Sequence, residues 1–324
     1  MSESKLRQPL QPERVAALVI TYFPDLGLAE RLDRLLEQFP RVLVVDNGSA
    51  EAGLRQLEGH ARRAGFGLVR NEANLGIAAA LNQGIRRLAE EGFGWVVTFD
   101  QDSTICPGFL LAMLATLNAQ PDPKQIALIG ANRIDPDNDI EHRWVRPHRI
   151  PPFFERVPCA QATSGVTLVI TSGAFTNVEL FRELGGFRED LFIDMVDNEY
   201  CLRVTTRGYK VLVSCEASLL HKVGDKTRSS KVGVGISATH HSPLRKYYLF
   251  RNSIPVMWAY GRIQPHWLIY HLLALSEMIL GIVFLETHKG TKLKACALGI
   301  IDGLAGQNGP SRRTWGQTAT VNPK

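Results

Sequence analysis

The sequence has few cysteines, and no two of them form a C-x-x-C pair. An odd number without that spacing predicts neither a disulfide framework nor a zinc ribbon, and it favours a reducing compartment such as the cytoplasm. A secretory signal peptide is not expected either, because Met1–Glu13 is polar and the apolar run Val15–Thr21 is short. The five cysteines are Cys106, Cys159, Cys201, Cys215 and Cys296.

Two phosphate-binding signatures are absent. No G-x-G-x-x-G follows the first predicted strand and no G-K-S/T occurs, which argues against a dinucleotide enzyme and a P-loop NTPase. The net charge is only +5, but residues 222–262 contain eight Lys or Arg against Asp225 alone. This tract predicts an anionic partner such as a membrane surface, with no nucleic acid partner expected; a solvated basic face is the alternative.

The first 132 residues alternate short apolar runs with amphipathic stretches, and 45% of all residues are hydrophobic. The runs are VAALVIT, VLVVD, GLVRN, WVVTFD and IALIGAN, which indicate β-α-β-α-β order. Runs that are apolar on both faces are typical of a parallel sheet covered by helices. We therefore predict an α/β fold with a Rossmann-like, mostly parallel sheet, and a ligand crevice at the carboxyl ends of its strands.

The second half is less regular. Asp135–Pro158 predicts an insertion near the acceptor side, and the stretch from Lys222 to His241 predicts a loop. Between them we expect a strand over 166–171, a helix from Asn177 to Gly185, a helix over 194–207 and a strand over 210–214.

A mostly apolar segment, His266–Leu285, is nearly long enough to span a bilayer. However, His266, Tyr270, Glu277 and Gly281 recur at helical spacing on one side. A charge inside lipid is costly, so the pattern favours an amphipathic helix. Such a helix lies on a membrane surface, packs on the core or forms a homodimer interface.

Asp100 and Asp102 come where the predicted strand WVVTFD ends. Side chains two apart on an extended segment point the same way, so both carboxylates can face one ligand. Hard cations such as Mg²⁺ or Mn²⁺ suit these oxygens and usually also bind substrate phosphates. A metal here would neutralise a leaving diphosphate, although acidic turns are common without any metal.

Other strand ends and helix starts carry polar groups of a nucleotide site. Asp46 can accept a hydrogen bond from a pyrimidine N–H and Tyr22 can stack on its ring; a helix N-cap is the alternative for Asp46. Gly76 opens a helix whose N–H groups can face an anion.

Acids also cluster near the predicted helix start at 194. One of them can remain an ionised base. His221 can be a third protein ligand of a metal bound by Asp102, although a single histidine is more often structural.

Together and in this order, the motifs resemble the inverting glycosyltransferases of family 2, which have the GT-A fold. The similarity extends from about Val15 to Asn252 through VVDNGS, NxGxAAAxNxG, FDQDS, TSG, FxDxVDxExCLR, HxxG and YYLFRN. The DQDS and YYLFRN segments are similar to those of bacterial rhamnosyltransferases that use dTDP-L-rhamnose. The length and C-terminal helix are similar to those of the second rhamnosyltransferase of rhamnolipid synthesis, and O-antigen enzymes share these motifs.

The resemblance implies a role for each matching residue. Asp197 falls at the catalytic base, with Asp194 as the competing candidate and Glu199 as a neighbouring acid. The metal would bind Asp102 and His221. Donor contacts are implied for Thr21, Tyr22, Asp46, Asn74, Gly76, Asp100 and Gln101, and acceptor or diphosphate contacts for Ser172, Gly173 and Arg251.

The expected organisation has four parts. A flexible N-terminus (1–13) precedes a transferase domain (14–255), whose donor half is 14–132 and whose acceptor half is 133–255. A C-terminal amphipathic helical region (256–310) and a tail (311–324) follow. The expected partners are dTDP-L-rhamnose, an amphiphilic glycolipid or saccharide acceptor, and the inner face of the cytoplasmic membrane. The competing functions are a non-catalytic glycan-binding relic and a nucleotidyltransferase, whose Gly/Arg/Lys-rich signature is not found.

Overall fold

The computed structural model describes residues 9–134, 142–162, 165–220, 227–229, 236–238 and 240–313. Within them, eight strands form one sheet in the order β3-β2-β1-β4-β9-β6-β10-β5. Strands β3, β2, β1 and β4 are parallel, as are β6 and β10, whereas β9 runs antiparallel between β4 and β6. The strands are β1 (Val15–Thr21), β2 (Val42–Asp46), β3 (Gly67–Arg70), β4 (Trp95–Asp100), β5 (Thr104–Ile105), β6 (Ile126–Ile134), β9 (Ala174–Asn177) and β10 (Lys210–Leu220).

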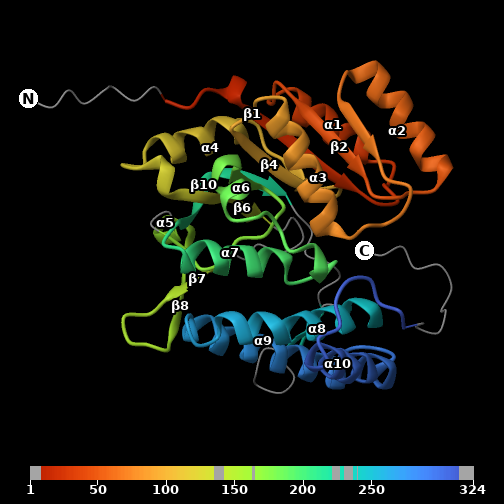
Figure 1. Cartoon of the computed structure of the whole chain (residues 1–324), viewed down its shortest axis with the longest axis vertical. Coiled ribbons are helices and arrows are strands. Elements are labelled where there is room, and N and C mark those ends of the chain that lie inside the picture. The colour runs from red at the N-terminus through yellow and green to blue at the C-terminus, as the bar shows by residue number, and fades with distance from the viewer. Residues whose placement is uncertain are drawn as a thin grey trace, which may run out of the picture.

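Helices cover both faces of this sheet (Figure 1). Residues of β1 alternate between the two sides, so that Leu18 packs with α3 and α7 while Val19 packs with α1 and α4. The helices are α1 (Leu28–Leu36), α2 (Glu51–Ala64), α3 (Ile77–Glu90), α4 (Phe109–Asn118), α6 (Val178–Glu183) and α7 (Val196–Thr206), with short 3-10 turns at Pro12–Arg14, Pro123–Gln125 and Glu189–Leu191. Two apolar cores, one on each face, hold the sheet in place.

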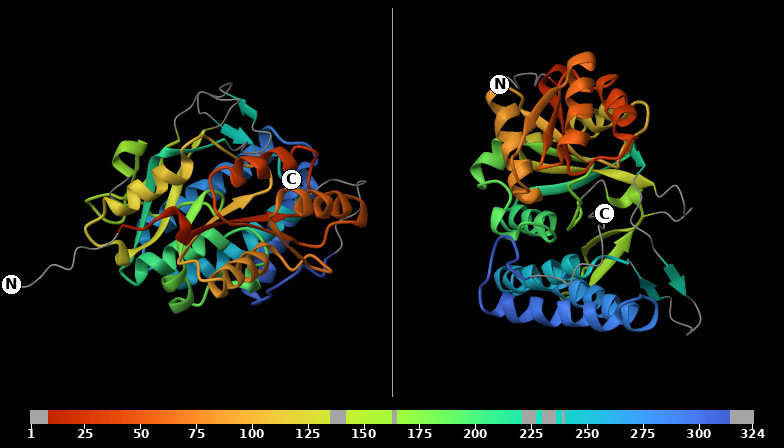
Figure 2. Two further views of the ribbon diagram at one scale, coloured as in Figure 1. Left: turned by 90° about the horizontal axis from the view of Figure 1, so that it is seen from above. Right: turned by 90° about the vertical axis from the view of Figure 1, so that its right-hand side faces the viewer.

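Three long helices form a separate layer below the sheet, as Figure 1 and the right-hand view of Figure 2 show. They are α8 (Pro243–Tyr260), α9 (Pro265–Phe284) and α10 (Lys289–Leu304). Helices α8 and α10 approach closely because α10 contributes glycines: a Cβ added at Gly303 would lie 2.6 Å from the carbonyl oxygen of Arg251. A buried Glu286 between Lys246 and Lys292, at 3.0 and 2.6 Å, ties the same helices together.

A hairpin of β7 (Trp144–Pro147) and β8 (Phe154–Val157) connects the sheet with this layer. Its Phe154 ring packs edge to face on Tyr270 of α9, with ring centroids 5.3 Å apart. The short helix α5 (Cys159–Ala162) follows, and a second hairpin pairs β11 (Thr227–Ser229) with β12 (Ile236–Ala238). The first hairpin thus lies within the expected insertion at 135–158, and the second lies within the expected loop at 222–241.

The predicted parallel strands of the first half and the helix stop at Gly185 are confirmed, but other expectations are wrong. Residues 166–171 are not a strand, because Val166 N bonds Val211 O while Thr167 N bonds Val145 O, and the strand comes later as β9. Helix α7 begins at Val196 rather than 194, and β10 continues to Leu220.

A disulfide joins Cys159 to Cys215, with their Cα atoms 5.6 Å apart. The expectation that the cysteines form no disulfide is therefore wrong for this pair. The two residues are 56 positions apart in the sequence and are brought together by the packing of α5 on β10. Cys106, Cys201 and Cys296 are free thiols.

Helix α9 buries polar residues and exposes leucines. His266, Trp267 and His271 face the interior, and His271 Nε2 lies 2.8 Å from Ser253 Oγ of α8. The outer side carries Leu272, Leu273, Leu280, Val283 and Phe284. By length and composition alone, the helix could cross a bilayer. Only 22% of the residues in its most apolar stretch of 18 residues are buried.

Candidate active site

Polar side chains meet where β1 and β2 end. Thr21 and Asp46 are the last residues of these strands, pair in register and are buried. Thr21 Oγ1 donates to Asp46 Oδ2 at 3.0 Å, and Ser49 donates to the same carboxylate through Oγ at 2.6 Å and N at 2.9 Å. The carboxylate therefore holds the turn after β2, and its contact with a nucleobase stays a prediction.

Gln101 connects the ends of β1 and β4. Its Nε2 donates to Tyr22 O at 3.1 Å, and its Oε1 accepts from Tyr22 N at 2.9 Å. The ring of Tyr22 meets Phe23 edge to face at 4.6 Å, and Phe23 is 40% exposed. The amide of Gln101 thus positions the backbone that carries the predicted stacking residue.

Asparagine side chains build the turn that leads into α3. Asn47 Nδ2 donates to Asn74 Oδ1 at 3.0 Å, and Gly76 N donates to the same oxygen at 2.9 Å. Gly76 has φ +87°, and a Cβ there would lie 2.6 Å from the carbonyl oxygen of Phe192. Only glycine fits this position, because the loop before α7 rests directly on the start of α3.

Asp100 and Asp102 lie at the carboxyl end of β4, as expected, but not on an extended segment. Asp100 ends the strand, while Gln101 and Asp102 form a turn that the Ser103 N to Asp100 O bond closes at 3.2 Å. The reasoning from alternate side chains on a strand is therefore wrong. Asp100 is partly buried and Asp102 is exposed.

Ser172 and Gly173 lie beside this turn. Ser172 Oγ accepts from Asp100 N at 3.1 Å and lies 2.6 Å from Ser103 Oγ. Gly173 N donates to Thr98 O at 2.7 Å. The structure thus brings the T-S-G segment to the D-Q-D segment, and Ser172 supports the backbone of Asp100.

The acids of α7 have different surroundings. Asp197 and Glu199 are two residues apart in the helix, so their side chains point about 200° apart. Glu199 is 1% exposed, pairs with Arg203 at 2.7 Å and accepts from Tyr260 Oη at 2.7 Å. Its carboxylate therefore anchors α7 to α8, and a role in catalysis stays a prediction.

Asp197 differs from its two neighbours because, among the described residues, no cation lies within ion-pair distance of it. Its Oδ1 accepts from Asn198 N at 2.8 Å and from Asn198 Nδ2 at 3.1 Å, and within the described ranges it forms no ion pair. Burial raises the pKa of Asp197 and the charge of Asp194 acts in the same direction, while the bonds from Asn198 oppose them. Asp194 differs, because Arg245 Nη2 lies 2.6 Å from its Oδ1.

The loop before α7 is held in an unusual conformation. Phe192, Asp194 and Met195 have positive φ angles of 65°, 61° and 64°. Asn252 of α8 stabilises the loop, because its Nδ2 donates to the carbonyls of Leu191, Ile193 and Asp194 at 2.8, 2.8 and 3.0 Å. Residues in this conformation often mark functional loops, and this loop contains Asp194 and leads directly into the helix that carries Asp197.

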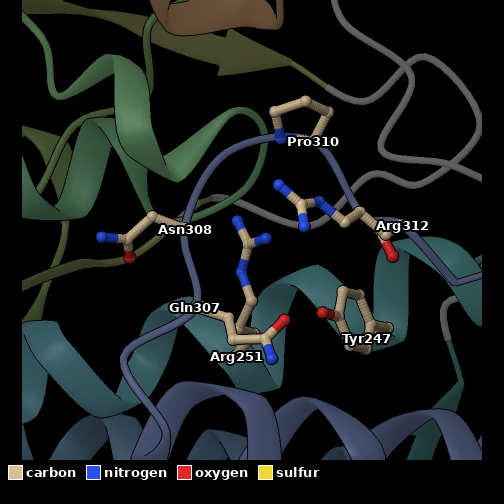
Figure 3. Close-up of a pocket in the computed structure, with 7 residues that line it drawn as sticks. Tyr247, Arg251, Gln307, Asn308, Pro310 and Arg312 are labelled. Atoms are coloured by element: carbon tan, nitrogen blue, oxygen red, sulfur yellow. The ribbon is translucent and has the colours of Figure 1, made fainter.

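Arg251 lies away from the strand ends. It is 1% exposed and donates to the carbonyls of Leu191 and Gly309 at 3.2 and 2.6 Å. Figure 3 shows its guanidinium, with that of Arg312, pointing into a cavity of about 240 Å³ between α8 and the residues after α10. These contacts connect the loop before α7 to the C-terminal segment, and an acceptor or diphosphate contact of Arg251 stays a prediction.

Two arginines that lie near the carboxylates of the site were not predicted as site residues from the sequence. Arg245, at the start of α8, pairs with Asp194, and the charges of Asp100 and Asp197 help to raise its pKa. Arg133, at the end of β6, lies within electrostatic reach of Asp197 and Asp100. The position of Arg133 near the end of a predicted strand could have indicated a place in the ligand crevice, whereas nothing in the sequence linked Arg245 to Asp194.

The predicted metal ligands are described only in part. His221 lies outside the described residues, and within them no group of three or more His, Cys, Asp or Glu side chains could hold an ion. The donor set of the turn nevertheless fits Mg²⁺ or Mn²⁺, because such ions need only one or two carboxylates when phosphates complete the shell. Asp102, exposed at the end of β4, meets that requirement.

The chain matches a known family over more than half its length. Residues 17–185 match the family described as Glycosyl transferase family 2. The chain is also 30% identical over 312 residues to dTDP-rhamnosyl transferase RfbF of Shigella flexneri, covering 92% of this chain and 98% of the relative. It belongs to glycosyl transferase family 2. The resemblance to this family is confirmed, and the chain is a glycosyltransferase.

Solved structures of transferases have the same fold. Mannosyltransferase PcManGT from Pyrobaculum calidifontis, in complex with GDP-Man and Mn²⁺, has a TM-score of 0.56 at 17% identity over 93% of this chain and 76% of that one. Residues 1–349 of S. aureus TarS, in complex with UDP-GlcNAc, have a TM-score of 0.55 at 15% identity over 89% and 81%. The family 2 enzyme thus has a GT-A fold with added C-terminal helices.

Proposed function

We propose that this family 2 enzyme transfers L-rhamnose from dTDP-L-rhamnose to a hydroxyl of a lipid-linked or glycolipid saccharide, with inversion at the anomeric carbon. The similarity to a dTDP-rhamnosyl transferase over nearly both full lengths carries the proposal of the donor. The described carboxylates at the strand ends support catalysis rather than a binding relic.

The catalytic base is Asp197. Of the acids at the start of α7, Asp194 is neutralised by Arg245 and Glu199 by Arg203, whereas the described part of the chain offers Asp197 hydrogen bonds from Asn198 but no ion pair. In a single displacement Asp197 takes the proton of the acceptor hydroxyl while that oxygen attacks the anomeric carbon. The bond from this carbon to dTDP breaks on the opposite face.

The donor binds along the ends of β1, β2 and β4. Tyr22 stacks on thymine and Asp46 bonds its N–H, while Gly76 and the start of α3 lie near the diphosphate. Asp102 holds a divalent cation, which would supply positive charge to the leaving diphosphate when bound. Arg245 lies near Asp100 and Asp197 and can add positive charge on the same side.

Incubation of the enzyme with dTDP-L-rhamnose, other dTDP-sugars and an acceptor panel, read by mass spectrometry, tests the donor. The panel contains mono-rhamnolipid and lipid-linked precursors of O-antigen type, because the sequence suggests both acceptors. We expect transfer from dTDP-L-rhamnose alone, loss of transfer by about 100-fold or more in Asp197→Asn, and retained dTDP binding in that variant. Asp102→Ala should instead lose metal-dependent donor binding. Near-normal turnover of Asp197→Asn would disprove the base.

The C-terminal layer docks on an anionic membrane surface. Its outer side carries the leucines of α9 together with Ile300, Ile301 and Leu304 of α10. Exposed cations, Arg262, Lys289 and Lys294, lie on the same layer. Of its three acids, Glu286 and Asp302 are buried and paired, and Glu277 is partly buried. Apolar area bordered by cations favours anionic lipid.

Flotation with liposomes of phosphatidylglycerol and phosphatidylcholine tests this surface. Leu273→Glu and Phe284→Glu should reduce the floating fraction, because each places a charge on the lipid-facing side. Leu111→Glu is the matched control, since Leu111 is 65% exposed on α4 of the sheet domain. A surface variant that still floats but changes from dimer to monomer in sedimentation would indicate a homodimer interface instead.

A further inference from the structure

Arg133 is a partly buried cation whose charge has no partner of opposite sign at close range among the described residues. It lies at the carboxyl end of β6, and burial lowers its pKa. Its Nη2 lies 2.8 Å from His142 Nε2, while its Nε is buried without a hydrogen-bond partner among the described residues. No carboxylate within those ranges comes within ion-pair distance of it, although Asp197 and Asp100 act on it from farther away.

Trp144 supplies a second unpaired donor at the same place. The guanidinium of Arg133 lies 5.9 Å from the centroid of the Trp144 ring. Trp144 is 2% exposed, and its indole Nε1 has no partner in the described part of the chain. Buried donors are rarely left unpaired, because the loss of hydration is not compensated. Two such donors side by side point to a ligand that accepts from both.

The position of the pair favours the acceptor over the donor. Strand β6 is separated from β4, which carries Asp100, by the antiparallel strand β9. The other neighbours of Arg133 are Asp197 on α7 and Tyr270 on α9, and Trp144 belongs to the hairpin that packs on α9. The pair therefore lies two strands away from β4 in the sheet, beside elements that carry none of the proposed nucleotide contacts.

We propose that Arg133 and Trp144 form an acceptor subsite that binds an oxyanion, a phosphate or a carboxylate, carried close to the accepting hydroxyl. This inference rests on the proposed function of Asp197. The guanidinium donates through Nε to the oxyanion, and the indole Nε1 donates to a second oxygen. The acceptor is thus an anionic glycoside, held so that its hydroxyl faces Asp197.

Three synthetic acceptors distinguish the chemistry: a neutral octyl α-rhamnoside, the same compound with a phosphodiester between sugar and chain, and one with a carboxylate on the chain. Binding of each to the enzyme saturated with dTDP is measured by calorimetry, and transfer by mass spectrometry. We expect Arg133→Met to weaken the anionic probes about 10- to 100-fold, which is the range for a hydrogen bond to a charged group. The neutral probe and dTDP should bind as in the wild type.

Two further variants keep the test independent of folding. Arg133→Lys retains the charge and should recover part of the affinity, and Trp144→Phe removes one donor while keeping the ring. Arg156→Met is the matched control, because Arg156 is exposed and stacks on Tyr270 at 5.6 Å without an unpaired buried donor.

Equal weakening of neutral and anionic probes, or no weakening in Arg133→Met, would overturn the subsite. Weakened dTDP binding would assign Arg133 to the donor and overturn it as well. Because the subsite is measured by binding, its outcome is separate from that of the proposed function. Absence of transfer from dTDP-L-rhamnose would reject the proposed donor. The calorimetric comparison of anionic and neutral probes would still test the subsite.

Discussion

Replacing Asn252 by alanine should release the loop that leads into α7, the helix that carries the proposed base Asp197. Asn252 is 2% exposed on α8, and its side-chain amide is bonded to three carbonyls between Leu191 and Asp194. No other side chain bonds the carbonyls of both Ile193 and Asp194 among the described residues. The variant therefore removes the main support of this loop, together with the bond that Asn252 Oδ1 accepts from Arg251 Nε at 2.9 Å.

The magnitude follows from the loop's conformation. Three of its residues, Phe192, Asp194 and Met195, have positive φ, and each costs about 1–3 kcal/mol in a non-glycine residue. The amide hydrogens of Asn252 contribute about 1 kcal/mol each, and carbonyls left buried cost about 1–3 kcal/mol. Without the Asn252 side chain, relaxation of the loop therefore becomes favourable. Because the loop leads into α7, Asp197 would shift with it, and a displacement of about 1 Å would reduce turnover about 100-fold.

The assay compares turnover, dTDP affinity and amide hydrogen exchange. Asn252→Ala should lose turnover and exchange faster over residues 191–195, with dTDP affinity unchanged. Ser253→Ala is the control, because Ser253 bonds Leu249 O and His271 rather than the loop, so it should lose stability but keep turnover. Normal turnover and unchanged exchange in Asn252→Ala would refute the reasoning.

Three other changes test the assignments. Asp194→Asn should move the acidic limb of the pH dependence of kcat/KM to lower pH, because the charge of Asp194 helps to raise the pKa of Asp197; an unchanged limb would contradict that coupling. Glu199→Gln should lower the free energy of unfolding by about 3 kcal/mol in urea titration, since it leaves the charge of Arg203 without its buried partner, while a loss confined to kcat would make Glu199 catalytic. Burial lowers the pKa of His271 to about 4, so the folded state binds fewer protons than the unfolded state between about pH 6.5 and pH 4. Stability should therefore fall as the pH falls through that range, and less steeply in His271→Asn.

Local pattern was enough to predict the donor half. Strands β1, β2 and β4 have the predicted bounds because their apolar runs are continuous and each ends in polar residues. Asn177 caps α6 by accepting from Glu179 N, as its position before the helix indicates. These features depend on neighbours in the chain, which is why hydrophobic spacing and capping residues reveal them.

Contacts between distant segments could not be predicted in this way. Nothing local distinguishes Asp194, Asp197 and Glu199, because each is an acid near a helix start; their partners come from α7 itself and from α8, 51 to 61 residues later for Arg245 and Tyr260. The leucines of α9 face outward because its histidines find partners inside, His271 at Ser253 of α8 and His266 at Thr167. The burial of Arg133 likewise depends on the hairpin that places Trp144 beside it.

The sequence by itself determined the fold class, the family and the strand ends where the donor-side residues lie, because periodic burial and short motifs are properties of continuous segments. Only the tertiary structure decided which of the acids near the start of α7 form ion pairs among the described residues and which does not. It also decided which buried donors lack partners. Charge pairing and burial depend on through-space distances of a few ångströms, and these are established only when the separate segments pack together.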